Sequence, residues 1–346
     1  MIYGAYGYTG ELIAREAARR GWNPILAGRD SAKLQALAGE LGLAHRVFDL
    51  DDDALVQRNL RGVALVLHCA GPFSATARPM LDACLQVGSH YLDITGEIDV
   101  LEETLSRDAA ARQAGVVVWP AVGFDVIPTD CVAAALKKAL PDATHLALGF
   151  DSRSRLSPGT TKTTIEGAAR GGRVREGGRL RDVRIGHHVR RIDFGDGEKS
   201  AMTIPWGDLA TAYVTTGIPN IEVFTATSQR RIAMARRAHL FRAVLGLAPV
   251  QRFLKSRVAG RVRGPDANQR DQRPTFVWGE VRNAAGSVKT ARIKVANGYS
   301  MTATGALAIA EFVLNQRPAP GAYTPSLLCG PDLVTTLPGS GPLSIG

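Results

Sequence analysis

Three glycines in the first ten residues, MIYGAYGYTG, constrain most strongly how this chain folds. A short apolar start leads into Gly4, Gly7 and Gly10, and a helical pattern follows. Glycine lets a backbone turn tightly and approach a pyrophosphate, whose charge then faces the N–H groups that open the helix. The spacing G-x-x-G-x-x-G is not the best-known fingerprint, so a turn that needs glycine for shape alone is an equal alternative. The cofactor-binding residues expected here are Gly4, Tyr6, Gly7, Tyr8, Thr9 and Gly10.

The next element favours a cofactor. Pro24 to Gly28 is typical of a second strand, and Arg29 follows it about twenty residues after the glycine turn. An acidic residue at this place binds the ribose of NAD, whereas an arginine accommodates the 2′-phosphate of NADP. Asp30 could instead take the ribose, but as N-cap of a helix from Ser31 it has a structural explanation. The sequence therefore predicts NADP, with NAD possible.

Composition indicates two globular domains with ordinary cores, because the 346 residues are 45% hydrophobic and 21% charged. Neither a leader nor a run of eighteen apolar residues occurs, so we expect no export, no membrane span and a cytoplasmic protein. The four cysteines are scattered, which predicts reduced thiols. The seven histidines show no metal-ligand spacing, so no metal site is expected.

The formal charge of +10 is concentrated in one stretch. Residues 228–273 hold twelve Lys/Arg against two Asp, which accounts for the whole excess. Within it, residues 238–258 pair apolar residues with arginines at near-helical spacing, broken by Pro249. This pattern fits an anionic membrane or a carrier-linked acyl chain, but an ordinary packing helix with a solvated basic face is the commoner explanation. Nucleic acid is not expected, because few aromatics are interleaved.

From Met1 to about Phe150, strand-like and helix-like runs alternate, which is typical of a parallel sheet covered by helices on both faces. Six strands in this order predict an α/β, Rossmann-type doubly wound sheet. A second, α+β style follows, with a hairpin around Gly286. A strong helix over Thr302–Gln316 and a Pro/Gly-rich tail are expected to pack back on the first domain. The expected domains are therefore 1–128, 129–300 and 301–346.

The chain resembles the saccharopine dehydrogenase-like oxidoreductases, which include saccharopine reductases and trans-acting enoyl reductases. GAYGYTG with AGRD, CAGPF, HYLDITGE and GFDVIPTD carry the resemblance in order, and strings such as WGEVRNAAG and NGYSMTATGALAIAEFVL extend it. The resemblance implies an NAD(P)-binding Rossmann domain and a saccharopine-reductase-like second domain that mediates homodimerisation in many members. It does not identify a substrate, because members act on varied compounds.

Candidate catalytic residues come from loops that follow the fifth and sixth strands. Glu97 and Asp125 are the favoured side chains, although helix capping or turn hydrogen bonds would also explain them. Tyr91 and Asp93 lie on one face of the fifth strand by alternation, so a proton relay there is a further possibility. His68, in a buried strand, is expected to be a core residue. Tyr299, before the last helix, is a second-domain candidate.

The strand ends nearest the nicotinamide supply the remaining cofactor residues. Gly71 permits close backbone approach and Phe73 packs on a ring, against the alternative of a simple strand-ending turn with a core aromatic. The full set expected outside the glycine turn is Arg29, Asp49, Ala70, Gly71, Pro72 and Phe73.

The sequence thus predicts an NADP-dependent oxidoreductase that transfers hydride to a C=N or C=C bond of a small-molecule or carrier-linked substrate. Two alternatives stay open. One is a non-catalytic NAD(P)-binding regulator or sensor, since no proton donor is obvious. The other is a peripheral membrane protein that uses the basic segment 228–273.

Overall fold

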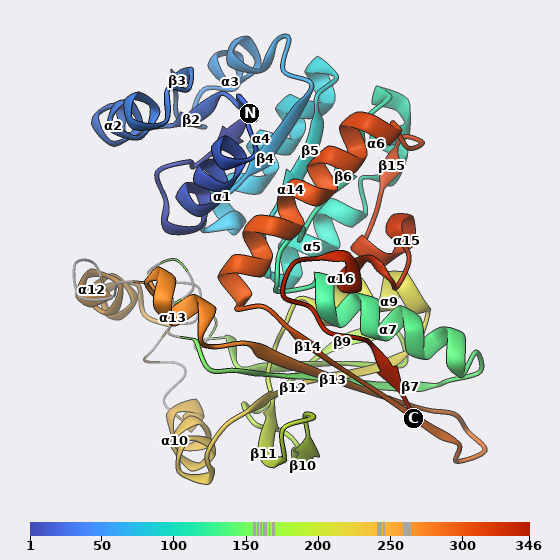
Figure 1. Cartoon of the computed structure of the whole chain (residues 1–346). Coiled ribbons are helices and arrows are strands. Elements are labelled where there is room, and N and C mark those ends of the chain that lie inside the picture. The colour runs from blue at the N-terminus through green and yellow to red at the C-terminus, as the bar shows by residue number, and fades with distance from the viewer. Residues whose placement is uncertain are drawn as a thin grey trace. The chain divides into compact units, whose positions relative to one another are not determined.

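The computed structural model describes residues 1–154, 157, 159, 161, 165, 167, 170–240, 244, 246–258 and 264–346. These residues form two compact units, each with its own sheet (Figure 1). Unit 1 comprises Met1–Ile127 and Tyr299–Leu328, and unit 2 comprises Pro128–Gly298 and Cys329–Gly346. The segment 301–346, expected to pack on the first domain, divides between them: residues up to Leu328 join unit 1 and the rest join unit 2.

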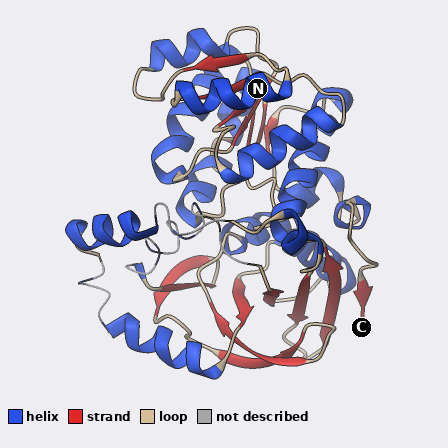
Figure 2. Ribbon diagram, turned by 60° about the vertical axis from the view of Figure 1, so that its left-hand side comes forward, coloured by secondary structure: helices blue, strands red, loops and turns tan. Residues whose placement is uncertain are grey.

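Unit 1 is built on a parallel sheet of seven strands in the order β15-β6-β5-β4-β1-β2-β3. The predicted doubly wound fold is therefore confirmed. The central strands are continuous apolar runs because helices cover both faces of the sheet (Figure 2). The strands are β1 (Ile2–Tyr3), β2 (Leu26–Gly28), β3 (His45–Val47), β4 (Leu65–His68), β5 (His90–Asp93), β6 (Val117–Trp119) and β15 (Gly321–Ala322).

Helices of unit 1 bury one face and expose the other. In α1, for example, Ile13, Ala14 and Ala17 are buried while Arg19 is exposed. Glycines in the left-handed conformation end three of the helices, α2, α4 and α6, at Gly42, Gly88 and Gly115. The helices are α1 (Tyr8–Arg19), α2 (Ser31–Leu41), α3 (Asp53–Leu60), α4 (Phe73–Val87), α5 (Ile98–Leu105), α6 (Asp108–Ala114), α14 (Gly298–Gln316) and α15 (Pro325–Cys329).

Two features of unit 1 differ from the sequence prediction. Residues Asp99 to Gln113, whose sequence pattern predicts one helix, form parts of two helices, because Arg107, with ψ 13°, turns the chain between α5 and α6. The tail contributes a seventh strand, β15, which pairs in parallel with β6. Helix α14, which precedes β15 in the chain, packs Phe312 edge-on against Trp119 of β6, with ring centroids 6.1 Å apart.

Unit 2 contains a mixed sheet in the order β10-β11-β12-β7-β13-β14-β16. Strand β12 runs parallel to β7, whereas β13 is antiparallel to both β7 and β14. The hairpin predicted at Gly286 is confirmed as the β13–β14 turn, where Gly286 has φ +85°. The strands are β7 (His145–Ser152), β8 (Gly172–Glu176), β9 (Arg179–Val183), β10 (Val189–Asp193), β11 (Glu198–Thr203), β12 (Asn220–Ala226), β13 (Thr275–Arg282), β14 (Val288–Val295) and β16 (Ser344–Ile345).

Helix α7 packs closely on this sheet at Gly279, where a Cβ would lie 2.5 Å from Val132 and 2.8 Å from Leu136. Residues 160–169, whose Thr/Ser-rich start and pattern predict a helix, lie mostly outside the described part of the chain. The helices of unit 2 are α7 (Ile127–Ala139), α9 (Asp208–Thr216), α10 (Gln229–Leu240), α12 (Ala248–Val258), α13 (Ala267–Asp271) and α16 (Leu333–Thr336). Among the described helices, none has the length and apolar character needed to cross a bilayer.

Candidate functional site

Two of the three turn glycines are required by the packing of the protein itself. Gly4 has φ +80°, and a Cβ there would lie 2.8 Å from Ala70. At Gly10 a Cβ would lie 2.3 Å from the carbonyl oxygen of Gly4. These positions therefore need glycine whether or not a cofactor binds. The contact between Gly4 and Ala70 also brings the turn after β4 against the turn after β1.

Gly7 and the first turn of α1 are arranged differently. Gly7 is the N-cap and supplies no side-chain acceptor, and a Cβ on it would meet one atom within 4 Å, the Gly4 oxygen at 3.2 Å. Among the described residues, no acceptor bonds the amides of Thr9 and Gly10. Uncovered amides at a helix N-terminus, reinforced by the helix dipole, attract anions. The first turn of α1, where Tyr8 and Thr9 lie, therefore fits a phosphate.

Tyr6 positions the loop that follows β2. Its ring packs on Gly28, where a Cβ would lie 2.5 Å from the ring, and its hydroxyl accepts a hydrogen bond of 3.3 Å from the Asp30 amide. Between them lies Arg29, whose side chain is exposed and forms no ion pair with any described residue. The structure thus holds the backbone around Arg29 and leaves its guanidinium available to a ligand.

Asp30 is the N-cap of α2, as the sequence predicted. One carboxylate oxygen accepts from the Lys33 amide at 3.2 Å, and the other lies 2.7 Å from the Lys33 ammonium. These bonds lower the pKa of Asp30, the side-chain bond to Lys33 most. Both oxygens are therefore engaged, and the negative charge beside Arg29 is partly neutralised.

Asp49, after β3, is an exposed residue at the same edge of the sheet. One of its oxygens accepts from the Asp51 amide at 3.3 Å, which closes a local turn. The neighbouring Phe48 carbonyl accepts a hydrogen bond of 3.1 Å from Tyr3. The structure gives Asp49 a turn-forming contact, and its expected place in cofactor binding stays a prediction.

The turn after β4 leads directly into α4. Gly71 is exposed, and its position would admit a Cβ, since the nearest atom is 3.7 Å away on Phe73. Pro72 is the N-cap of α4, and the peptide bond before it is cis. Phe73 packs edge-on against His68, with ring centroids 5.3 Å apart. Packing within the protein does not require glycine at position 71. Close approach of a ligand to the backbone would explain why this residue has no side chain.

His68 is fully buried, and burial lowers its pKa to about 3. Its Nε2 lies 3.0 Å from the Thr76 hydroxyl, which itself donates to the Ala70 carbonyl at 2.6 Å. The Thr76 hydroxyl therefore accepts from Nε2–H, and Nδ1 is a buried atom without a hydrogen-bond partner. A neutral imidazole of this kind belongs to the core, as predicted.

Glu97 caps the start of α4 from a distance. Its two carboxylate oxygens accept from the amides of Phe73 at 2.8 Å and Ser74 at 3.0 Å. The carboxylate therefore stabilises the α4 N-terminus and holds the Gly71–Phe73 turn against the loop after β5. Its expected catalytic role stays a prediction, since both oxygens already serve this structural purpose.

Asp93 joins the ends of β5 and β6. One oxygen accepts from the amides of Thr95 and Ala121, both at 2.9 Å, and the other accepts from the Tyr91 hydroxyl at 2.7 Å. Ala121 has φ +57°, a left-handed conformation that a non-glycine residue rarely adopts. Burial raises the pKa of the fully buried Asp93 to about 6. This carboxyl fixes two loops at the carboxyl edge of the sheet.

Asp125 lies in the loop between β6 and α7, and burial raises its pKa to about 6. A Cβ at Gly96 would lie 2.6 Å from a carboxylate oxygen of Asp125, so glycine there makes room for this group. The adjacent Phe124 amide donates to the Thr302 hydroxyl of α14 at 3.0 Å. The loop that carries Asp125 is thus anchored to the first turns of α14.

Tyr299, at the start of α14, belongs to unit 1 rather than to the second domain in which the sequence placed it. Its ring packs edge-on against Tyr8, with centroids 5.0 Å apart. Since Tyr8 opens α1, this contact brings the C-terminal helix against the glycine turn.

These contacts connect several of the predicted residues into one closed ring at the carboxyl edge of the unit 1 sheet. Each member touches the next through a contact given above, and the ring passes through five separate segments of the chain. In order, it runs Tyr8 and Gly4, Ala70, Phe73, Glu97 and Gly96, Asp125 and Phe124, Thr302, Tyr299 and back to Tyr8. Two residues of the site were not predicted from the sequence. Thr302 accepts a hydrogen bond from the Phe124 amide, and Lys33 forms an ion pair with Asp30.

No group of His, Cys, Asp and Glu side chains that could hold a metal occurs among the described residues. The four cysteines are free thiols in this structure.

The fold and the uncovered helix N-terminus define a dinucleotide-binding domain of the doubly wound class. Residues 1–118 match the family model of the saccharopine dehydrogenase NADP binding domain. The resemblance stated from the sequence is therefore confirmed for this part of the chain.

Curated relatives match just over a third of the chain. A human saccharopine dehydrogenase-like oxidoreductase is 30% identical over 152 residues, covering 38% of this chain and 35% of the relative. A trans-acting enoyl reductase of Mycobacterium ulcerans is 32% identical over 140 residues, covering 38% and 33%. The matched part thus spans about a third of the relatives' length.

Solved structures show the fold of the whole chain. Saccharopine dehydrogenase (L-Glu forming) of Saccharomyces cerevisiae superposes with a TM-score of 0.67 at 12% identity, covering 100% of this chain and 99% of that chain. Homospermidine synthase of Legionella pneumophila, solved in complex with NAD, gives a TM-score of 0.68 at 10% identity, covering 100% and 90%.

Proposed function

We propose that the protein is an NADP-dependent oxidoreductase that transfers hydride to a C=N or C=C bond of a small-molecule or carrier-linked metabolite. The observation that carries this proposal is the N-terminus of α1, where the amides of Thr9 and Gly10 bond no acceptor among the described residues. The exposed guanidinium of Arg29, after β2, adds a group suited to a 2′-phosphate. The match of residues 1–118 to an NADP-binding family model supports the proposal. Relatives named enoyl reductases motivate the C=C alternative, and the wider resemblance motivates C=N.

The chain offers defined places for the coenzyme. The amides of Thr9 and Gly10 would bind the pyrophosphate, and Arg29 would bind the 2′-phosphate. Gly7 and Gly71 leave room for close approach. When bound, the nicotinamide supplies the hydride.

Asp125 is the residue to which we assign proton donation to the substrate. A carboxyl with a pKa of about 6 still donates a proton near neutral pH, whereas an ordinary aspartic acid is almost fully ionised there. Tyr299, beside Tyr8, is assigned to substrate or nicotinamide contact. Glu97 holds the Gly71–Phe73 turn in place.

Fluorescence titration with NADPH and NADH tests the cofactor. Arg29→Ala should weaken NADPH binding about 10- to 100-fold, because a charge-assisted contact to phosphate is lost, and should change NADH binding little. Arg58→Ala, an exposed arginine on α3 of the same unit, is the control. Equal affinity of the wild type for the two coenzymes would refute the NADP assignment.

NADPH oxidation with a cyclic imine and with an enoyl thioester tests turnover and separates the two bond types. If Asp125 donates the proton, kcat/KM should fall above pH 6, and Asp125→Asn should lose activity together with that dependence. Binding of NADPH without turnover of either class would instead favour a nucleotide-binding regulator.

A further inference from the structure

A long basic stretch of unit 2 contains no acidic residue. Residues 223–265, here called the acid-free segment, carry ten Lys/Arg and no Asp or Glu. The rest of the chain holds 32 of each sign, so this segment alone gives the protein its charge of +10. Arg242, Arg261 and Arg263 lie outside the described residues, and α10 and α12 contain the others. Within the segment no carboxylate compensates this positive charge.

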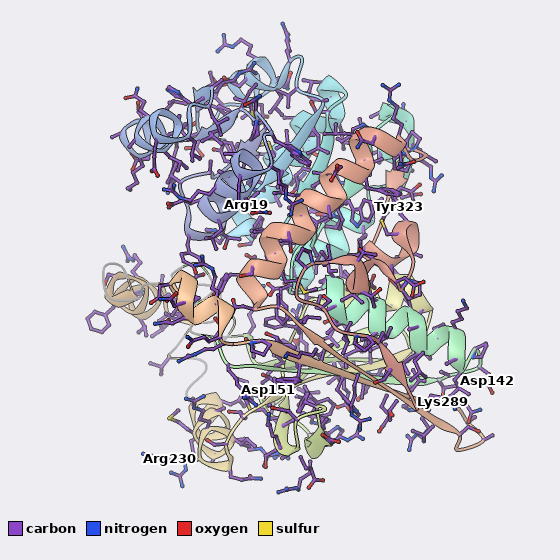
Figure 3. The ribbon with its side chains drawn as sticks, viewed as in Figure 1. Arg19, Asp142, Asp151, Arg230, Lys289 and Tyr323 are labelled. Carbon is purple, nitrogen blue, oxygen red and sulfur yellow. The ribbon has the colours of Figure 1, made fainter. Side chains whose placement is uncertain are left out.

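Helix α10 carries one arginine that attaches it to the rest of unit 2 and others that are exposed to solvent. Ile232 is 3% exposed, and Arg236 donates from Nε and Nη2 to the Gly186 carbonyl at 3.1 and 2.7 Å. These two residues attach the helix to unit 2. Arg230 projects outward from α10 (Figure 3), Arg231 and Arg237 are also exposed, and Met234 is 64% exposed.

Helix α12 exposes a mixed basic and apolar face. Its exposed residues Pro249, Arg252, Phe253 and Ser256 follow the i, i+3, i+4, i+7 spacing of one helical face. Phe253 is 55% exposed, while Gln251 faces the protein and donates to the Ile165 carbonyl at 3.1 Å.

Large exposed apolar side chains are concentrated here. The described chain has ten of them, and four lie in the acid-free segment, namely Met234, Val244, Leu247 and Phe253. Single exposed apolar residues are ordinary, but several interspersed with arginines and no acid form the pattern of an interfacial segment.

We propose that the described part of the acid-free segment, namely α10, Leu247 and α12, binds the surface of an anionic phospholipid membrane. The exposed arginines of α10 and α12 would contact lipid phosphates, and Phe253, Leu247 and Met234 would enter the headgroup region. A bilayer satisfies both halves of the pattern at once, since it offers anionic phosphates and an apolar interior. A soluble acidic partner explains the arginines but not the exposed apolar side chains. This proposal does not depend on the proposed enzymatic activity.

Co-sedimentation of the full chain with vesicles tests the proposal. Vesicles of phosphatidylcholine with 30% phosphatidylglycerol should bind the wild type, and pure phosphatidylcholine should not, with binding weakened by 0.5 M NaCl (~4 Å Debye length). The triple variant Arg230→Gln, Arg237→Gln and Arg252→Gln should bind roughly 100-fold more weakly, since each arginine contributes about fivefold. Phe253→Ser alone should weaken binding about tenfold.

A matched variant controls for net charge. Arg179→Gln, Arg181→Gln and Arg191→Gln removes three exposed arginines from β9 and β10 of the same unit and should leave vesicle binding unchanged. Circular dichroism and thermal melting verify that each variant folds. Three results would overturn the proposal: equal losses in the two triple variants, no binding to anionic vesicles at 50 mM NaCl, or binding unaffected by Phe253→Ser and matched by soluble polyglutamate.

Discussion

Two helices begin at one edge of the unit 1 sheet, and they differ in whether the protein supplies an acceptor for their first amides. In α4 the first amides donate to a carboxylate of the protein itself, Glu97, at 2.8 and 3.0 Å. In α1 the N-cap is Gly7, and the amides of Thr9 and Gly10 find no acceptor among the residues described. Both starts follow a parallel strand and carry the same partial positive charge.

The difference distinguishes the helix start that stabilises the surrounding loops from the helix start that is available to an anionic ligand. Where the chain supplies its own carboxylate, as at Glu97 and Asp93, it fixes one loop against another. Where it supplies none, it leaves an anion site with about half a positive charge. The glycines alone do not make this distinction, because Gly4 and Gly10 are required by packing.

The largest expected effect comes from giving α1 a carboxylate of its own. Gly7→Asp fits the backbone, since φ −72° and ψ 156° suit any N-cap residue. The new carboxylate should cap the Thr9 and Gly10 amides and repel a pyrophosphate, so the Kd for NADPH should rise about 1,000-fold. The free energy of unfolding should rise by only about 0.3 kcal/mol, because glycine is itself tolerated at an N-cap. Titration with NADPH and urea denaturation measure the two quantities.

Gly7→Asn is the matched control because it caps without charge. It should weaken NADPH binding less than the aspartate does, by about 30-fold. Unchanged NADPH affinity in Gly7→Asp would show that the first turn of α1 does not hold the coenzyme.

The second prediction concerns Asp93, a fully buried carboxyl that bonds the protein's own amides. Its pKa is raised in the folded state from 3.8 to about 6, so it favours folding below pH 4 and this contribution, about 3 kcal/mol, is lost as pH rises to 6. Asp93→Asn keeps an acceptor for Thr95 and Ala121 and should remove this pH dependence. Urea denaturation between pH 4 and 7 measures it.

Asp125 contributes in the same direction, because its pKa is also raised to about 6. The asparagine variant at position 93 should therefore flatten the pH profile only in part, and adding Asp125→Asn should flatten it further. A single Asp93→Asn variant with the full wild-type slope would show that this carboxyl titrates normally.

Periodicity and turn chemistry predicted most of unit 1. The apolar runs placed β1 to β6 in order, and the cap at Asp30 followed from its position before Ser31. The seventh strand could not be predicted, because Gly321 and Ala322 carry no strand pattern and pair with β6 through tertiary contact. The side chains of Tyr91 and Asp93 share a face, as alternation predicted, and are hydrogen-bonded at 2.7 Å.

The sequence predicted which residues belong to the site, but it did not predict which of them contact one another. Glu97, Asp125 and Tyr299 all lie in the ring, yet nothing local in the sequence pairs Tyr299 with Tyr8, or Glu97 with the α4 amides 24 positions away. Such pairings depend on which strand ends become neighbours. The aspartate two residues before Thr95 was a usable signal for the turn that Asp93 forms.

The third prediction removes the internal cap of α4. Glu97→Ala should lower the free energy of unfolding by about 1–2 kcal/mol, since two amides lose their acceptor. Added sulfate should recover part of this loss in the variant, because the α4 N-terminus would then resemble that of α1. Thermal shift with and without sulfate measures it.

Glu103→Ala on α5 is the control for Glu97→Ala, since its longer ion pairs of 3.7 and 3.8 Å are exposed and contribute little. If Glu97→Ala is no less stable than Glu103→Ala, the capping role assigned to Glu97 is wrong.

The smallest effect concerns the charge balance beside Arg29. Lys33 lies 2.7 Å from the Asp30 carboxylate, and removing it leaves that negative charge to compete with a phosphate for Arg29. Lys33→Ala should raise the Kd for NADPH about threefold and leave that for NADH unchanged, because a screened surface charge has a modest effect. Adding Asp30→Asn, which preserves a cap for α2, should restore the wild-type affinity. Absence of that restoration would mean that Lys33 contacts the coenzyme directly, so the α2 start would belong with α1 as a ligand-receiving helix end.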